Sequence, residues 1–351
     1  MRLSGPYLTD MTKDELSAML SDWGEPAFRA AQIQSWLLRG VPPENMTNLP
    51  KSLRERLGAL PLGGVKIYQK YASAQDGTEK YLFHLEDENL VEGVIMRYHY
   101  GNTACISTQV GCNMGCKFCA STLEGCVRNL RVGELLGQVS AIERDIGPGG
   151  RDRGVTNVVL MGSGEPLDNY GNVVEFLHRL TSPEGMGISP RNVSLSTCGI
   201  VPRMETLASD APHVTLSVSL HAHDNETRNR LMPVNKVYPI ETVLAAANGY
   251  GRATGRRVVF EYALIQGINA GKADADALAK RLKGMLCHVN LIPLNPVPER
   301  GLKGCSRPEA NAFALRLQQN HISATVRREM GTDIQGACGQ LRRRVMDEVR
   351  A

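Results

Sequence analysis

The feature that most constrains the fold is a regular alternation of strand-like and helix-like runs from residue 103 onward. Alternation of this kind predicts a parallel sheet whose strands are joined by right-handed helical crossovers. Six or seven such units fall short of the eight of a closed barrel, so the sequence predicts an α/β fold with an open or partial (βα)6-type barrel. In such folds the chemistry lies at the carboxyl ends of the strands. The strand-like runs lie at 104–109, 156–161, 192–196, 214–220, 257–264, 288–293 and 323–328, and the helix-like runs at 132–146, 170–180, 201–208, 239–253, 272–285 and 308–319.

Two different regions precede this alternation. Residues 1–62 predict helices, because Thr12 and Glu15 form a capping-box pattern and further helical runs follow at about 26–39 and from Pro50. Residues 63–97 contain three β-like runs, with Asp76-Gly77 as a hairpin signal between the first two. The sequence therefore predicts a small helical N-terminal domain (1–62), a short antiparallel β connector (63–97), a core (98–331) and a C-terminal segment (332–351).

The composition excludes some classes of protein. The 351 residues carry 40 Lys and Arg against 36 Asp and Glu, a net charge of +4 that is normal for a globular protein. No run approaches the roughly 20 apolar residues of a membrane helix, and the first ten residues lack the apolar stretch of a secretory signal. We therefore expect a cytoplasmic protein without a membrane partner. The charge permits a nucleic-acid partner through local basic patches.

The cysteines are the first sign of chemistry. There are nine, an odd number that argues against a disulfide scaffold, and five of them lie between residues 105 and 126. Cys112, Cys116 and Cys119 are separated by three and then two residues, with Phe118 just before the last. Three thiolates would leave one iron of a four-iron cluster without a protein ligand. A zinc site with Cys126 as the fourth ligand is the alternative, although zinc sites usually show paired C-x2-C elements or histidines.

Polar or glycine-rich turns follow four of the predicted strands. Because the carboxyl ends of parallel strands share one edge of the sheet, we expect these turns to face a single mouth. Glu165 could accept hydrogen bonds from an ammonium group there. The four turns lie at 159–169, 194–200, 216–222 and 290–296.

The segment Cys112-Asn-Met-Gly-Cys116-Lys-Phe-Cys119 resembles the cysteine motif of the radical S-adenosylmethionine (SAM) superfamily. The resemblance implies a four-iron, four-sulfur (4Fe–4S) cluster, held by these three cysteines, whose open iron binds SAM. With the later turns and the segment 331–341, which contains Cys338, nearly the whole chain resembles the RlmN family. That family methylates C2 of adenine 2503 in 23S rRNA and of adenine 37 in tRNAs.

The RlmN resemblance also implies roles for individual residues. Cys338 would take a methyl group from one SAM molecule, and a radical formed from a second SAM would activate that methyl for addition to C2. Cys105 would then remove the C2 proton, and a transient Cys105–Cys338 disulfide would form as the product leaves. Glu92, in Val91-Glu-Gly-Val-Ile, matches the family's proton acceptor. The implied SAM contacts are Gly164, Glu165, Ser196, Ser219, Leu220, His221 and Asn295.

Some choices stay open at this point. The cysteines alone do not separate C2 methylation from the C8 methylation of the related Cfr enzymes, and a zinc-stabilised RNA-binding module is the alternative from another class. The resemblance implies 23S rRNA and tRNA as partners, a one-electron donor such as flavodoxin, and a monomer. Candidate phosphate contacts, each of which could equally be a solvated charge, are Arg128, Arg131, Arg151, Arg153, Lys303, Arg307 and Arg342–Arg344.

Overall fold

The computed structural model describes residues 7–147, 154–295 and 297–334. The N-terminal helices are α1 (Lys13–Asp22), α2 (Arg29–Leu38) and α3 (Lys51–Gly58). The predicted capping box is confirmed, since the Glu15 amide donates to Thr12 Oγ1 and the Thr12 amide donates to the Glu15 carboxylate. Buried side chains from all three helices, among them Leu16, Ile33 and Leu53, form a hydrophobic cluster of their own.

One ten-stranded sheet forms the centre of the remaining chain, in the order β1-β2-β3-β4-β7-β8-β9-β10-β11-β12. The pairs up to β4 are antiparallel and those from β4 to β12 are parallel. The predicted α/β fold is confirmed. The strands are β1 (Lys66–Ala72), β2 (Glu79–His84), β3 (Leu90–Tyr98), β4 (Gly101–Cys105), β7 (Asn157–Leu160), β8 (Val193–Thr197), β9 (Thr215–Ser219), β10 (Val258–Leu264), β11 (Cys287–Pro293) and β12 (Ala324–Val326).

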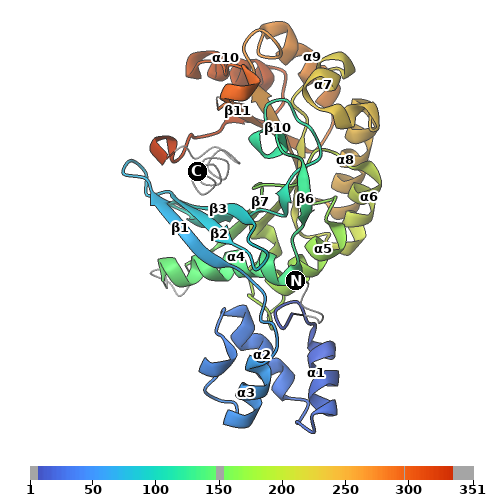
Figure 1. Cartoon of the computed structure of the whole chain (residues 1–351). Coiled ribbons are helices and arrows are strands. Elements are labelled where there is room, and N and C mark those ends of the chain that lie inside the picture. The colour runs from blue at the N-terminus through green and yellow to red at the C-terminus, as the bar shows by residue number, and fades with distance from the viewer. Residues whose placement is uncertain (1–6, 148–153, 296, 335–351) are drawn as a thin grey trace.

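Helices cover the outer side of the parallel strands, and the N-terminal helices lie below them as a separate lobe (Figure 1). Apolar side chains from the strands and the surrounding helices form one large core that includes Val158, Leu195 and Phe260. The helices after the N-terminal domain are α4 (Val132–Ile146), α5 (Tyr170–Thr181), α6 (Val201–Asp210), α7 (Asn225–Leu231), α8 (Ile240–Thr254), α9 (Lys272–Leu282) and α10 (Arg307–Gln319).

The β connector differs from its prediction in one respect. It is antiparallel, as expected, but it continues the barrel sheet, because β3 pairs with β4 over five residues from Val94–Cys105 to Tyr98–Gly101. Tyr81, Phe83 and Ile95 on one face of these strands belong to the large core. The opposite face therefore stands next to the concave side of the parallel strands.

The first predicted strand, 104–109, is divided in two. The chain leaves β4 after Cys105, because Ser107 Oγ donates to the Glu92 carbonyl and the amides of Thr108 and Gln109 donate to Ser163. Gln109–Gly111 (β5) then pairs with Cys126–Asn129 (β6) as a two-stranded hairpin. This hairpin closes the loop that contains the three motif cysteines.

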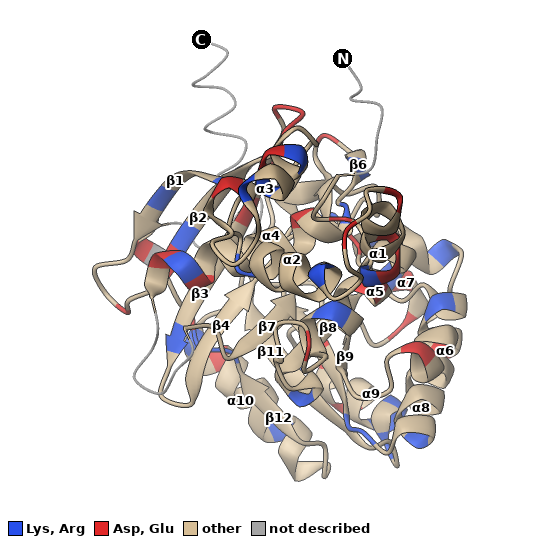
Figure 2. Cartoon of the chain, turned by 90° about the horizontal axis from the view of Figure 1, so that it is seen from below, with Lys and Arg blue, Asp and Glu red and all other residues tan. Residues whose placement is uncertain are grey.

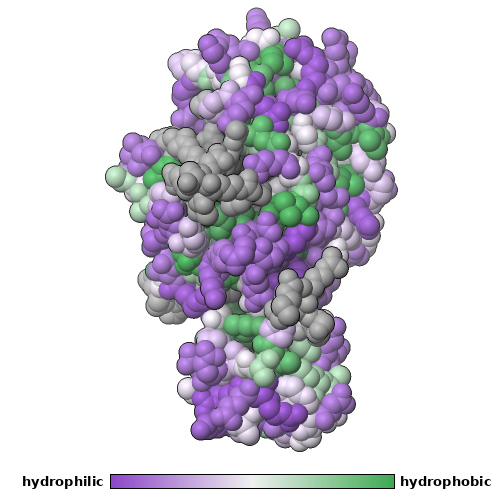
Figure 3. Space-filling model, in the orientation of Figure 1, coloured by the Kyte–Doolittle hydropathy of each residue, from purple (hydrophilic) through white to green (hydrophobic). Residues whose placement is uncertain are grey.

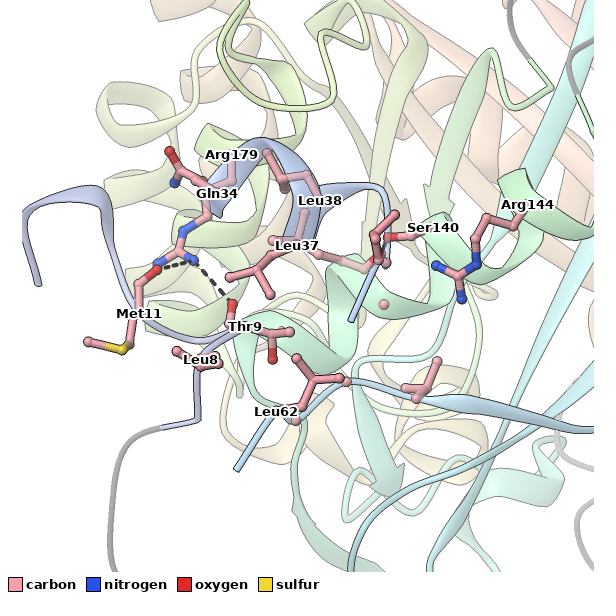
Figure 4. A pocket seen from close by; sticks show the side chains of 18 residues that line it. Leu8, Thr9, Met11, Gln34, Leu37, Leu38, Leu62, Ser140, Arg144 and Arg179 are labelled. Atoms are coloured by element: carbon pink, nitrogen blue, oxygen red, sulfur yellow. Dashed lines mark hydrogen bonds between the residues drawn. The ribbon is translucent and has the colours of Figure 1, made fainter. Parts of the chain in front are cut away.

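The N-terminal lobe is fixed to the barrel through a few polar contacts. Arg179 of α5 donates to the backbone carbonyl oxygens of Thr9 and Met11 (Figure 4). It also donates to the carbonyl oxygen of Asp10. The carboxylate of Asp10 accepts from the amide of Gly133 in the first turn of α4, at 2.7 Å. These contacts border a small cavity of about 80 Å³ between the lobe and α4. Hydrophobic residues gather at the same junction on the surface, while the rest of the lobe is mostly hydrophilic (Figure 3).

Candidate active site

The carboxyl ends of the parallel strands surround a cavity of about 260 Å³. Side chains that the sequence places on separate turns lie together around it, as the layout of a parallel sheet requires. The cavity is lined by Cys112, Cys116, Cys119, Gly164, Glu165, Ser196, Ser219, His221 and Asn295, all of which the sequence predicts as site residues. Leu220 does not line it: its side chain is fully buried, and its amide donates to the Glu261 carbonyl.

The cysteine loop is held at both ends and in the middle. The Cys112 amide donates to the Gly125 carbonyl, and the Lys117 amide donates to the carbonyl of Leu231 at the end of α7, at 2.8 Å. Thr122 Oγ1 donates to the carbonyls of Cys116 and Cys119. The backbone of Gly115, between the first two cysteines, has a φ of 69°, which glycine adopts without strain. The loop is thus built to bring its thiols to one side.

The donor set fits an iron–sulfur cluster. Cys112 and Cys116 are buried, Cys119 is half-buried, and the three thiols face the same cavity. Burial raises the pKa of the Cys112 thiol to about 12 and that of Cys116 further still, so thiolates here require a bound cation. Cys126, the fourth ligand of the zinc alternative, does not line the cavity. A four-iron cluster held by these three motif thiols would have one iron open for a substrate.

Glu165 is a buried carboxylate at the wall of the cavity. Its Oε1 accepts from the amide of Leu167 at 3.0 Å, and its Oε2 accepts from the amide of Cys198 at 2.7 Å. Burial raises its pKa, and an ammonium ligand would counteract that effect. The loop can come this close only because residue 164 is glycine: its φ is 109°, and a Cβ there would lie 2.6 Å from the Gln109 amide.

His221 connects the end of β9 to the cysteine loop. Its Nδ1 accepts from the amide of Ala263 at 2.9 Å, so the proton of the neutral ring is on Nε2. Burial lowers the pKa of the imidazole to about 3, and the ring is therefore neutral at ordinary pH. Phe118, the aromatic residue of the cysteine motif, meets the His221 ring edge-on with 4.6 Å between ring centroids. The motif aromatic thus orients the loop against the barrel.

Three further groups at the cavity were missed from the sequence. Glu261 on β10 is buried, lines the cavity and accepts from Asn290 Nδ2 at 2.8 Å; Arg327, after β12, also lines it. The signal for Glu261 was present, since it is a lone charge inside the apolar strand Val-Val-Phe-Glu-Tyr-Ala-Leu. Cys198, which follows β8, is the third: it lines the cavity and its amide holds Glu165.

Glu92 and Cys105 lie elsewhere, on the antiparallel strands. Glu92 on β3 is buried and its carboxylate lies 3.4 Å from the ammonium of Lys80, whose side chain is 1% exposed. Cys105 is paired with Val94, two residues after Glu92, so the period of two places the Cys105 and Glu92 side chains on one sheet face. Neither lines the 260 Å³ cavity. Cys338 lies outside the described residues.

Two of the candidate phosphate contacts have structural partners instead. Arg128 donates to both carboxylate oxygens of Glu134 and to Asp87, and Arg131 contacts Glu134 and Asp10. Glu134 is completely buried in this network. Both signs of charge are interspersed over the face seen in Figure 2, without a continuous basic patch. Arg151, Arg153 and Arg342–Arg344 lie outside the described residues.

Three thiols, a buried carboxylate and polar strand-end turns around the mouth of a partial barrel define a radical SAM enzyme. Residues 106–278 match the model of the Radical SAM superfamily. Residues 7–61 match that of the ribosomal RNA large subunit methyltransferase N-terminal domain. A crystal structure of a radical SAM methyltransferase from Sphaerobacter thermophilus is 43% identical with a TM-score of 0.91, covering 96% of this chain and 99% of that one.

Similar proteins identify the family of this chain within the radical SAM class. The chain is 50% identical to a probable dual-specificity RNA methyltransferase RlmN of Clostridium beijerinckii, over 96% of this chain and 94% of that protein. It is 49% identical to the protein of the same description from Alkaliphilus oremlandii, over 96% and 97%. The chain belongs to the RlmN family. Its cofactors are a 4Fe–4S cluster and SAM, and this membership contradicts the alternative of a zinc-stabilised binding module. No helix of the described residues is long and apolar enough to span a membrane.

Proposed function

We propose that this enzyme methylates C2 of adenine in RNA, at adenine 2503 of 23S rRNA and adenine 37 of tRNAs. One observation carries the proposal: nine predicted site residues from five separate turns surround a single cavity at the strand ends. The names of the relatives, which describe dual-specificity RNA methyltransferases, support RNA as the substrate. Strand β4, which ends at Cys105, pairs with β7, and Leu160 at the end of β7 lines the cavity.

Within this proposal, Cys112, Cys116 and Cys119 hold the cluster, and the strand-end residues hold SAM. Glu165 accepts from the SAM ammonium, and neutral His221 and the hydroxyls of Ser196 and Ser219 line the remaining wall. The remaining SAM contacts in this proposal are Asn295, Gly164 and the backbone of Leu220. When bound, the cluster supplies the electron that cleaves SAM and so provides the hydrogen-abstracting species.

The cysteines outside the cluster carry the methyl group and release the product. Cys338, as a thiolate, attacks the methyl carbon of one SAM, and S-adenosylhomocysteine leaves. Loss of one hydrogen atom from this sulfur-bound methyl gives a carbon radical, which forms a carbon–carbon bond with C2. Cys105 removes the C2 proton, and the unpaired electron of the adduct would return to the oxidised cluster. The Cys105 thiolate then attacks the sulfur of Cys338, the disulfide forms as the bond between that sulfur and the product carbon breaks, and the released carbon takes a proton to become the methyl group. Glu92 is the second proton acceptor on this face, held in place by Lys80.

The position of methylation is the test of this proposal. The reconstituted enzyme is incubated anaerobically with SAM, a reductant and either a 23S rRNA fragment or a tRNA, and the digested nucleosides are identified by mass spectrometry against standards. We expect 2-methyladenosine from both RNAs. 8-Methyladenosine would support the Cfr-like alternative, and an unmethylated RNA in either reaction would remove that substrate. The electron donor, a monomeric state and a cytoplasmic location remain predictions from the sequence.

A further inference from the structure

Arg228, on the short helix α7, is a completely buried arginine next to the cavity. Its guanidinium donates five hydrogen bonds, and every acceptor is neutral. Nη2 donates to the carbonyl of Cys198 at 2.7 Å and of Ser219 at 3.2 Å, and Nε donates to the carbonyl of Leu220 at 3.2 Å. Nη1 donates to Asn235 Oδ1 at 2.8 Å and to the carbonyl of Tyr238 at 3.3 Å.

These bonds join the two turns that carry much of the site. The carbonyl of Cys198 belongs to the residue whose amide holds Glu165, and Leu220 directly precedes His221. The same helix also supports the cysteine loop, because the carbonyl of Leu231 at its end accepts from the amide of Lys117. Arg228 therefore holds the ends of β8 and β9 in place beside the loop.

The charge of Arg228 is also unusual. Burial lowers its pKa to about 10, so it is still a cation at neutral pH, and the groups that face it electrostatically are the thiols of Cys116 and Cys198. Cys116 and Cys198 pack in one apolar cluster with Leu231, the last residue of α7. A buried charge without a carboxylate partner is costly. The positive charge of Arg228 therefore acts on any group that the cysteine loop binds.

We propose that Arg228 is a positioning residue for the cofactor site and that its fixed positive charge favours the reduced cluster. Reduction adds one negative charge to the cluster. A cation bound to the carbonyl of Cys198, which lies in one apolar cluster with the ligand Cys116, stabilises that charge in a low-dielectric surrounding. The inference rests on the proposed ligands Cys112, Cys116 and Cys119, and it does not depend on which RNA or which carbon is methylated.

Three variants of the full chain separate charge from structure. Arg228→Gln keeps hydrogen-bonding capacity and removes the charge, and Arg228→Lys keeps the charge with fewer bonds. Arg179→Gln is the matched control, because Arg179 is also buried and also donates to three backbone carbonyls, but at the N-terminal lobe. Iron and sulfide content, thermal stability and the midpoint potential from a redox titration followed by electron paramagnetic resonance are measured for each.

We expect Arg228→Gln to lower the equilibrium constant for cluster reduction about tenfold, which is 59 mV for one electron. Arg228→Lys should keep the equilibrium constant for cluster reduction within threefold of the parent value but lower the thermal stability. Arg179→Gln should lower the thermal stability without a change in the midpoint potential. Equal potentials for the Gln and Lys variants of Arg228 would overturn the proposal. Such a result would mean that the charge of Arg228 has no influence on the cluster and that only its hydrogen bonds matter.

A further variant, at Asn235, tests the role of the charge if Arg228→Gln does not fold. Asn235→Asp brings a carboxylate to Nη1, where the amide oxygen now lies at 2.8 Å, and so cancels the charge without removing the arginine. We expect the potential to fall here as well, and an unchanged potential would overturn the role of Arg228. If instead the assignment of the cluster ligands were wrong, Cys116→Ala would keep its iron. That result is distinct from an unchanged potential in the Arg228 and Asn235 variants.

Discussion

Two regions of this molecule compensate their buried charges in different ways. At the junction with the N-terminal lobe, Glu134 is paired with Arg128 and Arg131, and Arg179 is paired with Glu175. At the cavity, Glu165 is held by backbone amides and Arg228 by carbonyl and amide oxygens. Hydrogen bonds hold the charged groups in both regions, but only the junction also pairs each of them with a charge of opposite sign.

The difference distinguishes charges that stabilise the fold from charges that are available to bind a ligand. An ion pair in the interior makes little net contribution, yet it is strongly destabilising to break, so the paired residues hold the lobe in place. A charge bound only by neutral dipoles keeps its field, and a ligand of opposite sign can use it. Substitutions on the two sides should therefore affect different measurements.

The largest effect is expected at the cluster ligands. Replacing any one of Cys112, Cys116 or Cys119 by Ala should abolish cluster assembly and SAM cleavage, because a missing thiolate leaves a second iron without a protein ligand. Iron and sulfide analysis after anaerobic reconstitution, with the yield of 5′-deoxyadenosine, measures both. Cys126→Ala is the control and should keep both activities, since Cys126 does not line the cavity. SAM cleavage by Cys116→Ala would contradict the assignment.

The second prediction separates Cys105 from Cys338. Cys338→Ala should neither accept a methyl group nor form a conjugate with RNA, since the early carrier is missing. Cys105→Ala should load the methyl group and attack RNA but fail to release it, because the late proton acceptor is missing. A covalent conjugate on denaturing gels that nuclease removes is the readout. Normal turnover by Cys105→Ala, or a conjugate from Cys338→Ala, would refute these roles.

The third prediction tests the paired side of the comparison. Glu134→Ala removes the carboxylate shared by two arginines and should lower the free energy of unfolding by about 3 kcal/mol, the lower end for breaking a buried pair, because both arginines keep partial access to water. Urea unfolding measures the loss. SAM affinity of the folded variant should be unchanged, and a large loss of affinity would show that the junction and the cavity are not separate.

The fourth prediction tests the unpaired side. Glu165→Ala should weaken SAM binding by about 1.5–3 kcal/mol, the contribution of a charged hydrogen bond, while the iron content stays constant. Isothermal titration of the reconstituted enzyme measures the affinity. Glu165→Gln, which loses only the charge, should lose most of the same affinity. A folded Ala variant with parental affinity would remove Glu165 from the SAM site.

Much of the fold and the cavity could be predicted because the relevant signals are local. The βα alternation located the seven strands from β4 to β12, and glycine or polar residues after four of these strands marked turns that line the cavity. A parallel sheet then brings distant turns together without further information. Glu165 and His221, 56 residues apart, were placed at one mouth for this reason.

The parts that could not be predicted depend on tertiary contacts. Arg128 and Arg131 suggested phosphate contacts, because the sequence does not show that Glu134 is buried beneath them. Arg228 lies in the polar segment Asn-Glu-Thr-Arg-Asn-Arg-Leu, which is typical of a solvated helix. The hairpin strand β6 is only four residues long and partly exposed, so it carries no clear strand pattern.

The smallest effect is expected at Asp10, where the lobe caps α4. Asp10→Ala removes an acceptor for the Gly133 amide and a contact 3.3 Å from Arg131, and the loss of a helix cap costs about 1 kcal/mol. Both tryptophans of the chain, Trp23 and Trp36, lie in the lobe. Their fluorescence during urea unfolding should therefore shift to lower urea, while the far-ultraviolet circular dichroism transition, dominated by the barrel, shifts less.

Asp14→Ala is the matched control for Asp10, because Asp14 is an exposed carboxylate in the first turn of α1. It should leave both transitions close to those of the parent. SAM affinity and iron content should be the same in both variants, since neither residue contacts the cavity. If Asp10→Ala weakened SAM binding as much as Glu165→Ala does, the lobe would act on the cavity, and the separation between paired structural charges and ligand-directed charges would be wrong.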